Sequence, residues 1–401
     1  MGKYAAVDYR ENYGCGDLPI DIRPLAGRAD LTTFLNLPQQ FYHKDPHWIE
    51  PLRLERRQHL SKHNPLFEHL DWQGWLAWRG SQPVGRITAQ LDHLHQQRYG
   101  DGTGYFGMLE AADDPAVFAA LTASAEEWLR RRGARRVIGP FNLSINDECG
   151  LLVEGFDRPP MFMMGHARPY YAQRLEEQGY NAAKDLLAYW MSVADLRFTP
   201  FMRRLMAHCQ DRIHVRPISR ERFAADLEIL REIFNDAWSE NWGFVPFTQS
   251  EFHELGRNLR LFVAYDLIQI AEVDGAPAAF IVALPNINEA IRGLRGRLLP
   301  FGWMRLLWRL KVRYPLTGRI PLMGVCKRHQ FSRLGPALAL TLIAAIQKRM
   351  MAKGIQAVEM SWILEDNAGM RNILENIGTE LYKRYRLYQK PLAETGAVER
   401  A

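Results

Sequence analysis

The order of the expected secondary-structure elements repeats along the chain, and this repetition constrains the fold more than any other feature. Apolar periodicity and turn residues predict the same succession in both halves: a strand, a helix, a hairpin, a strand, a helix and a strand. In the first half these lie near 21–25, 29–42, 75–89, 105–110, 115–132 and 137–141. In the second half they lie near 214–218, 223–238, 267–284, 321–327, 336–353 and 357–362. The repeat predicts an α/β architecture of two tandem units.

The length agrees with two domains. A chain of 401 residues, 47% of them hydrophobic and 24% charged, can bury two cores of ordinary size. A junction is expected between residues 194 and 211. We therefore predict an N-terminal domain at 1–195, a C-terminal domain at 196–392 and a tail at 393–401.

Several classes of protein are disfavoured by what the sequence lacks. No apolar run is long enough to span a membrane, and the first residues contain no apolar signal-peptide core. The four cysteines, Cys15, Cys149, Cys209 and Cys326, are widely separated and show no metal-ligand or disulfide spacing. We expect a cytoplasmic protein without a metal ion.

The charge is unevenly distributed. No Asp or Glu occurs between residues 290 and 358, a stretch that carries 14 Lys and Arg residues, although the whole chain has a net charge of only +6. Such asymmetry favours a polyanionic partner: a phosphate-rich cofactor, an anionic lipid surface or nucleic acid. A solvated basic face is the simpler alternative.

The segment 322–338 is typical of a phosphate site. A strand runs into a turn and the turn opens a helix, whose first amides lack internal partners and carry partial positive charge. Such a turn can hold a pyrophosphate through backbone N–H groups. Pro336 suits the first helical turn, and Lys327, Arg328 and Arg333 add positive side chains.

This segment resembles the CoA-binding signature of the GNAT (N-acetyltransferase) superfamily, Gln/Arg-x-x-Gly-x-Gly/Ala. Gln330 matches its first position and Gly335 its last, whereas Arg333 replaces the middle glycine. The stretch 365–378 resembles the family's second element, with Asn367 and Gly378 at the expected separation. Leu374 stands where the family often has a tyrosine that protonates the departing thiolate.

The resemblance implies two tandem GNAT-like domains, each a mixed, mostly antiparallel sheet flanked by helices. The C-terminal domain would bind acyl-CoA as co-substrate, and the N-terminal domain, which lacks the signature, would be degenerate. The implied acyl-CoA contacts are Val325, Lys327, Arg328, Gln330, Arg333, Gly335, Pro336, Ala337 and Asn367.

A basic apolar insert at 293–314 precedes this segment. At helical spacing, Arg305, Arg309 and Arg313 form a stripe beside a broad apolar face formed by Leu299, Trp303, Leu306, Leu307 and Leu310. Such a helix suits an anionic membrane surface. A helix packed on the domain core, with arginine stems covering its edge, explains the pattern equally well.

The overall pattern resembles the bacterial ceramide synthases, a tandem-GNAT group that joins a fatty acyl group from acyl-CoA to the amine of a sphingoid base. The segments 138–142 and 241–246 contribute to this resemblance. It implies a lipid amine acceptor, peripheral attachment to the inner membrane and no nucleic-acid partner.

Acyl transfer to an amine needs a base, and a carboxylate or histidine within hydrogen-bond reach would serve. The candidate catalytic residues are Glu240, Glu359, Glu365, Asp366 and His329, with Tyr382 or Tyr385 as a substitute acid and Asp147 and Glu148 as a pair from the first repeat. Each also has a plain structural explanation, because most charged residues have no chemical role.

Other functions remain open from the sequence. A related transferase could take an aminoacyl group from tRNA, with the basic segment on the RNA backbone, or could modify a small-molecule amine. Arg333 and Leu374 would also suit a non-catalytic protein that binds CoA or lipid at a membrane surface.

Overall fold

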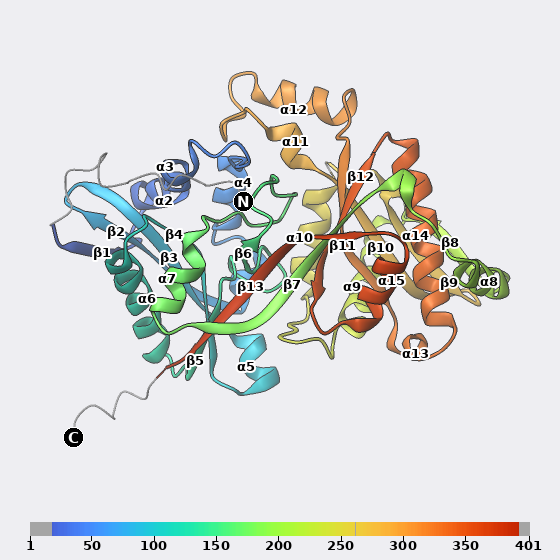
Figure 1. Cartoon of the computed structure of the whole chain (residues 1–401), viewed down its shortest axis with the longest axis horizontal. Helices are drawn as coiled ribbons and strands as arrows, with labels where there is room; N and C mark the ends of the chain where they lie inside the picture. The colour runs from blue at the N-terminus through green and yellow to red at the C-terminus, as the bar shows by residue number, and fades with distance from the viewer. Residues whose placement is uncertain (1–17, 261, 393–401) are drawn as a thin grey trace.

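The computed structural model describes residues 18–260 and 262–392, and these form one continuous sheet flanked by helices (Figure 1). The first repeat contains β1 Ile20–Pro24, α2 Arg28–Asn36, α3 Pro38–Tyr42, α4 Arg53–His59, η1 Pro65–Glu68, β2 Leu70–Arg79, β3 Gln82–Asp92, α5 His93–Tyr99, β4 Thr103–Ala111, α6 Pro115–Arg130, β5 Arg136–Gly139, β6 Leu151–Glu154, α7 Tyr170–Glu177 and β7 Asn181–Ser192.

The second repeat follows the same plan with an insertion. It contains η2 Val193–Asp195, α8 Pro200–Cys209, β8 Ile213–Pro217, α9 Phe223–Ala237, α10 Gln249–Leu259, η3 Tyr265–Leu267, β9 Ile268–Val273, β10 Ala276–Pro285, α11 Ile287–Ile291, α12 Gly302–Lys311, β11 Thr317–Val325, α13 Lys327–Gln330, α14 Leu334–Ala352, β12 Ala357–Leu364, α15 Ala368–Asn376 and β13 Glu380–Pro391. Helices α11 and α12 form the insertion between β10 and β11.

The two repeats share one sheet because their last strands cross between them. The strand order is β1-β2-β3-β4-β5-β13-β7-β12-β11-β10-β9-β8, with β6 also paired to β13. Strand β13, from the second repeat, pairs with β5 of the first, while β7 pairs with β12 of the second. Figure 1 shows these two long strands running side by side through the centre of the molecule.

The remaining pairs are antiparallel except for β4 with β5 and β11 with β12, which are parallel. This agrees with the predicted α/β class and with two GNAT-like units of mixed, mostly antiparallel sheet. The predicted boundary at residues 195 and 196 remains a proposal, since β13 lies within the sheet of the first repeat.

Separate apolar cores lie in the two repeats. In the second repeat, Trp238 at the end of α9 packs against Gly324 of β11, whereas Ile355, which follows α14, packs against Gly318. Helices α9 and α14 therefore cover opposite faces of this part of the sheet. Among the described residues, no helix is both long and apolar enough to cross a bilayer.

Some elements differ from expectation. The helix expected at 29–42 is divided into α2 and α3 at Pro38, which lacks an N–H for the helical ladder. Strand β11 begins at Thr317, four residues before the expected start. Strand β7 and helices α8 and α10 were absent from the expected elements. Strand β7 pairs with β12 and β13 of the second repeat, and α8 packs on α14.

Candidate functional site

The parallel strands β11 and β12 separate in the middle of the second repeat. Their pairing extends from Thr317 with Ala357 to Ile320 with Met360 and then ends. Beyond this point β11 pairs only with β10, and a register shift lies opposite Val282 and Leu284. The Cys326 amide donates to Ala278, so by antiparallel alternation the amide and carbonyl of Met323 turn toward the open side. The separation leaves a gap that the backbone amide and carbonyl of Met323 face.

Two charged residues face each other where this gap begins. Arg319 and Glu359 are register partners, both are 0% exposed, and their Nε and Oε1 atoms are 3.5 Å apart. Ser361 donates to Glu359 and accepts from Arg319 Nε at 2.8 Å. Tyr382, from β13, donates a hydrogen bond to the other carboxylate oxygen of Glu359. We call Arg319, Glu359, Ser361 and Tyr382 the central cluster.

Arg319 also ties the central cluster to the first repeat. Its Nη1 donates to the carbonyls of Phe162 and Met163 at 3.1 and 3.3 Å. Its guanidinium carbon lies 4.6 Å from the centre of the Trp362 ring. These contacts satisfy a buried cation that would otherwise be costly. The central cluster therefore lies where both repeats meet.

The surroundings keep the tyrosines of this region protonated. Burial, followed by the charge of Glu359, raises the pKa of Tyr382. Burial also raises the pKa of Tyr385, whose other influences include Glu359 and Glu148. Burial lowers the pKa of the neighbouring Lys383 to about 8, although its Nζ donates to the carbonyls of Arg158 and Pro159. Tyr382 is thus a neutral hydroxyl that can both donate and accept a hydrogen bond.

Two of the predicted catalytic residues, Glu359 and Tyr382, lie together in this cluster. Glu240, Glu365, His329 and Asp366 lie elsewhere. Glu240 is 81% exposed and pairs with Lys327, while Glu365 accepts from the Asp185 amide at 3.1 Å. His329 lies on α13, where Arg328 Nε approaches its Nε2 at 3.1 Å and burial lowers its pKa. Asp366 pairs with Lys184 at 2.8 Å.

The turn after β11 carries the predicted acyl-CoA contacts. Residues Lys327–Gln330 form the single turn α13, and α14 begins at Leu334, two residues earlier than expected. The side-chain Nε2 of Gln330 donates to the carbonyls of Val325 and Ala237 at 2.8 and 3.2 Å, which fixes the turn to β11 and to α9. The Lys327 amide donates to Asp236 at 2.7 Å.

The rest of this turn is more open. Arg333 and Pro336 are exposed, whereas Ala337 is buried at the start of α14. A side chain at Gly335 would lie 2.7 Å from the His329 carbonyl, so only glycine allows the chain to turn this tightly. Arg328 reaches the Pro277 carbonyl at 2.7 Å. Asn367 caps α15 by accepting from the Met370 amide at 3.0 Å. Eight of the nine predicted contacts thus lie between the end of β11 and the start of α14, whereas Asn367 lies at the start of α15. The role of all nine toward acyl-CoA stays a prediction.

The corresponding gap in the first repeat is filled by the chain itself. Strands β4 and β5 pair only from Thr103 to Tyr105, and the Phe141 amide then donates to Phe106 at 2.7 Å. Asn142 accepts from the Met108 amide at 2.8 Å, and a side chain on Gly107 would meet the Phe141 carbonyl at 1.6 Å. The segment 138–142, which had no chemical explanation in the sequence, therefore closes this gap.

The paired acids Asp147 and Glu148 lie in the loop that follows. Ser144 donates to Asp147 at 2.9 Å, and burial raises the pKa of Asp147. Burial acts in the same direction on Glu148, but the charge and hydrogen bond of Arg56 outweigh it and lower the pKa of that carboxyl. Asn146 of the same loop donates to the Val245 carbonyl at 3.2 Å, so the loop lies against the second repeat.

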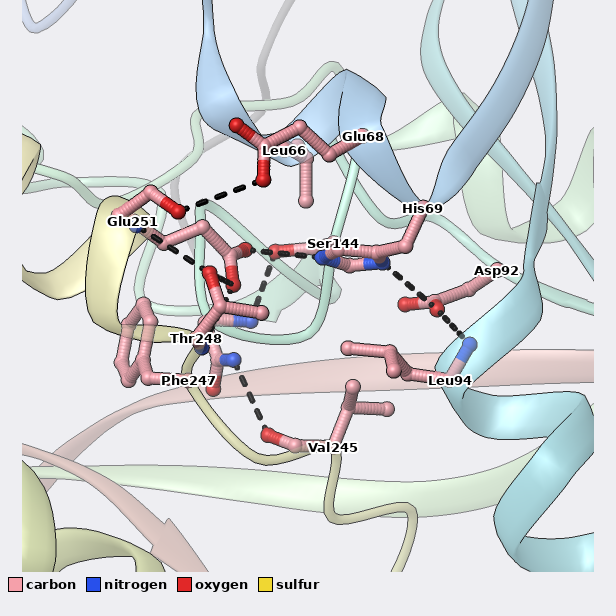
Figure 2. A network of polar contacts seen from close by, with 12 residues as sticks. Leu66, Glu68, His69, Asp92, Leu94, Ser144, Val245, Phe247, Thr248 and Glu251 are labelled. Carbon is pink, nitrogen blue, oxygen red and sulfur yellow. Dashed lines mark hydrogen bonds and ion pairs between the residues drawn. The ribbon is translucent and has the colours of Figure 1, made fainter.

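A second buried network joins the repeats (Figure 2). His69 lies between two carboxylates, with Nδ1 at 3.0 Å from Asp92 and Nε2 at 3.3 Å from Glu251. Burial alone would lower the pKa of His69, but Asp92 and Glu251 raise it to about 10. Glu251 also completes a capping box with Thr248 at the start of α10. The imidazolium therefore holds α10 of the second repeat against the first.

Arg319, Ser361 and His69 were not among the site residues predicted from the sequence. Arg319 was one of many cations in the basic stretch, although a charged residue between Gly318 and Ile320 in an otherwise apolar strand is unusual. Ser361 and His69 carry no sequence signal, because Arg319 reaches Ser361 from another strand and Glu251 reaches His69 from the other repeat. No cluster of residues suited to holding a metal ion occurs within 18–260 and 262–392.

The fold is that of tandem GNAT proteins. A tandem GNAT protein from the clavulanic acid biosynthesis pathway matches with a TM-score of 0.55 and 14% identity, covering 94% of this chain and 99% of that one. A GCN5-related N-acetyltransferase from Sphaerobacter thermophilus matches with a TM-score of 0.50 and 15% identity, covering 94% and 97% of the two chains. No family model matches the sequence.

Two curated proteins are much more similar in sequence. Protein YghO of Escherichia coli is 54% identical over 92% of this chain and 95% of its own length. The bacterial ceramide synthase of Caulobacter vibrioides is 46% identical over 93% of this chain and 98% of its own length. The chain belongs to the family of these two proteins, and it is an acyltransferase with a tandem GNAT fold.

Proposed function

We propose that the protein transfers a fatty acyl group from acyl-CoA to the amine of a membrane lipid, such as a sphingoid base. The observation that carries the proposal is the hydrogen bond from Tyr382 to the buried Glu359 where β11 and β12 separate. The likeness to a bacterial ceramide synthase supports the choice of acceptor. Acyl-CoA is the co-substrate of the fold family, and the basic turn at 327–333 suits its phosphates.

In this mechanism the donor's thioester arm lies along the open edge of β11. The Met323 amide, turned toward the gap, would donate to the thioester oxygen as negative charge develops there. The nitrogen lone pair of the neutral amine attacks the carbonyl carbon. Binding both substrates at the junction of the repeats supplies the orientation that direct transfer needs.

Proton transfer would pass through Tyr382. As the carbon–nitrogen bond forms, the amine proton moves to the Tyr382 oxygen while Tyr382 gives its own proton to Glu359. The carbon–sulfur bond then breaks, and a proton returns through Tyr382 to the CoA thiolate. Arg319 and Ser361 act as positioning residues, because they hold the carboxylate of Glu359.

We propose that the insertion helix α12 contacts the membrane and so brings the protein to its lipid acceptor. Its inner side chains Leu306 and Leu310 pack with Ile287 and Ile291, and Arg309 is fixed to the Ala290 and Arg292 carbonyls at 2.9 and 2.7 Å. The outer surface is apolar and basic: Leu299, Phe301 and Trp308 are 79%, 73% and 50% exposed beside Arg305, Lys311 and Arg313. One side of α12 thus packs on the protein, and the composition of the exposed side supports the proposed membrane contact.

The reaction is tested by mass spectrometry of products. Palmitoyl-CoA with sphinganine, and acetyl-CoA with spermidine, are incubated with the wild type and with Glu359→Gln and Tyr382→Phe. We expect N-acyl sphinganine from the wild type and a loss of about a hundredfold or more in either variant. The surface variant Glu127→Gln is the matched control. Full turnover by Glu359→Gln would contradict the mechanism, and product only from spermidine would contradict the lipid acceptor.

Membrane attachment is tested by vesicle flotation. Binding to phosphatidylglycerol vesicles should exceed binding to phosphatidylcholine vesicles, fall with salt and be lost in Leu307→Glu/Trp308→Glu. The control is Phe331→Glu, because Phe331 is 98% exposed but follows α13, at the opposite edge of the molecule from α12 (Figure 1). Equal loss in both variants would contradict a role specific to α12.

A further inference from the structure

An apolar cavity lies inside the second repeat, between the sheet and the helix pair α9 and α10. Its volume is about 40 Å³. Its lining residues include Phe223, Leu227, Leu255, Val263, Val282 and Leu322. Among the described lining residues Arg260 alone is charged, and its guanidinium carbon lies 5.5 Å from the Phe223 ring centre. A cavity with such walls excludes water and accepts apolar ligands.

The position of this cavity relates it to the central cluster. Leu322 contributes to its wall and lies two residues beyond Ile320, where β11 leaves β12. Val282, the register partner of Leu322, completes this side. The cavity thus adjoins the part of β11 along which the thioester is proposed to lie.

We propose that this cavity receives the alkyl chain of the acyl donor. The proposal rests on the function proposed above and specifies the donor as a long-chain acyl thioester. The lining residues that the structure describes all belong to 218–322, in the repeat that carries the basic turn at 327–333. This placement assigns the cavity to the donor rather than to an acceptor entering between the repeats. A full fatty chain exceeds 40 Å³, so the leucine side chains of α9 and α10 must move as the chain enters.

The wall formed by α10 is held from outside. Ser250 donates to Glu68 at 3.3 Å, Gln58 donates to Glu254 at 3.5 Å, and Glu251 lies beside His69. These contacts are visible in part in Figure 2. On its inner side, Gly256 approaches Leu227 so closely that a Cβ there would lie 2.6 Å from Leu227 Cδ1. Contacts with the first repeat therefore hold the backbone of α10 in place, and the leucine side chains of α9 and α10 are the groups that move when a chain enters.

The test fills or enlarges the cavity and measures chain-length preference. Val263→Phe fills it, Leu255→Ala enlarges it, and Val215→Phe is the control, since Val215 packs on the same core without lining the cavity. Turnover of octanoyl-, dodecanoyl- and palmitoyl-CoA is measured with sphinganine. Val263→Phe should lower the kcat/KM ratio of palmitoyl- to octanoyl-CoA about tenfold, Leu255→Ala should raise it, and Val215→Phe should leave it unchanged.

A binding readout separates this proposal from the proposed function. The probe is 11-(dansylamino)undecanoic acid, and its fluorescence should rise with the wild type and Val215→Phe but not with Val263→Phe. Unchanged chain-length preference and probe binding in Val263→Phe would overturn the cavity proposal while leaving acyl transfer intact. Probe binding that depends on Val263, without turnover of any donor, would support the cavity and reject the function. If Val263→Phe does not fold, an unchanged preference and probe affinity in Leu255→Ala overturns the proposal.

Discussion

Each repeat contains one parallel strand pair, β4 with β5 in the first and β11 with β12 in the second. The third pair of register partners is uncharged in the first repeat and charged in the second. In the first repeat this position joins Tyr105 to Ile138; in the second it joins Arg319 to Glu359. Beyond it, residues 140–142 close the first gap with backbone and side-chain hydrogen bonds, whereas the backbone amide and carbonyl of Met323 face the second gap.

The residues at the N-termini of α6 and α14 also differ in charge. Helix α6 begins at the acidic pair Asp113 and Asp114, of which Asp114 is the N-cap. Helix α14 follows Lys327, Arg328 and Arg333. Acidic side chains at a helix N-terminus would repel a pyrophosphate, and basic side chains there would attract it. One backbone plan therefore serves as a closed scaffold in the first repeat and as an open site in the second.

The largest expected effect comes from making the second repeat resemble the first. Glu359→Ile alone leaves the buried guanidinium of Arg319 without its carboxylate and should cost about 3–5 kcal/mol in free energy of unfolding. The double variant Arg319→Tyr/Glu359→Ile should recover most of this loss without recovering activity, because apolar groups can replace a buried ion pair. Urea unfolding measures the stability of both variants, and product formation measures their activity. A double variant no more stable than the single one would show that the arginine's other contacts dominate.

The closed gap is tested at Gly107. Gly107→Ala forces a methyl group against the Phe141 carbonyl and should cost about 3 kcal/mol, measured by urea unfolding. Gly369→Ala is the matched control, because the nearest atom to its Cβ would lie 3.9 Å away. Equal stability of the two variants would mean that the first gap has room for a methyl group beside the Phe141 carbonyl.

The contact between the repeats is tested through the pH dependence of His69. Its pKa is raised to about 10 in the folded protein against about 6.5 unfolded, so its contribution is complete below pH 6.5 and lost as pH rises toward 10. His69→Gln should cost about 2 kcal/mol near pH 6, and the difference from wild type should shrink by pH 10. Urea unfolding at several pH values measures it. A constant difference would show that His69 is not charged in the folded protein.

The smallest expected effect concerns the turn. Arg333→Ala should weaken CoA binding about threefold, more at low salt than at high salt, because an exposed cation is screened. Isothermal titration with CoA measures this change. Arg131→Ala on the closed repeat is the control and should bind CoA like the wild type. Tighter binding by Arg333→Ala would instead mean that the arginine obstructs the turn where the family has glycine.

Much of the fold followed from local pattern. The order of strands and helices, the hairpin at 267–284 and the helix at 336–353 depend on neighbours in sequence, so periodicity and turn chemistry predicted them. Glu359 and Tyr382 were both candidates as single residues. Their hydrogen bond was not predictable, because it joins two strands that are separated in the sheet order by β7.

The sequence by itself determined two GNAT-like repeats, a basic turn in the second and an amphipathic insertion helix. The tertiary structure decided which gap is open, that β7 and β13 exchange between the repeats, and that Arg319, Glu359, Ser361 and Tyr382 form one cluster. The physical reason is that strand pairing and burial join residues distant in the chain, and their register depends on the whole sheet rather than on any segment of it.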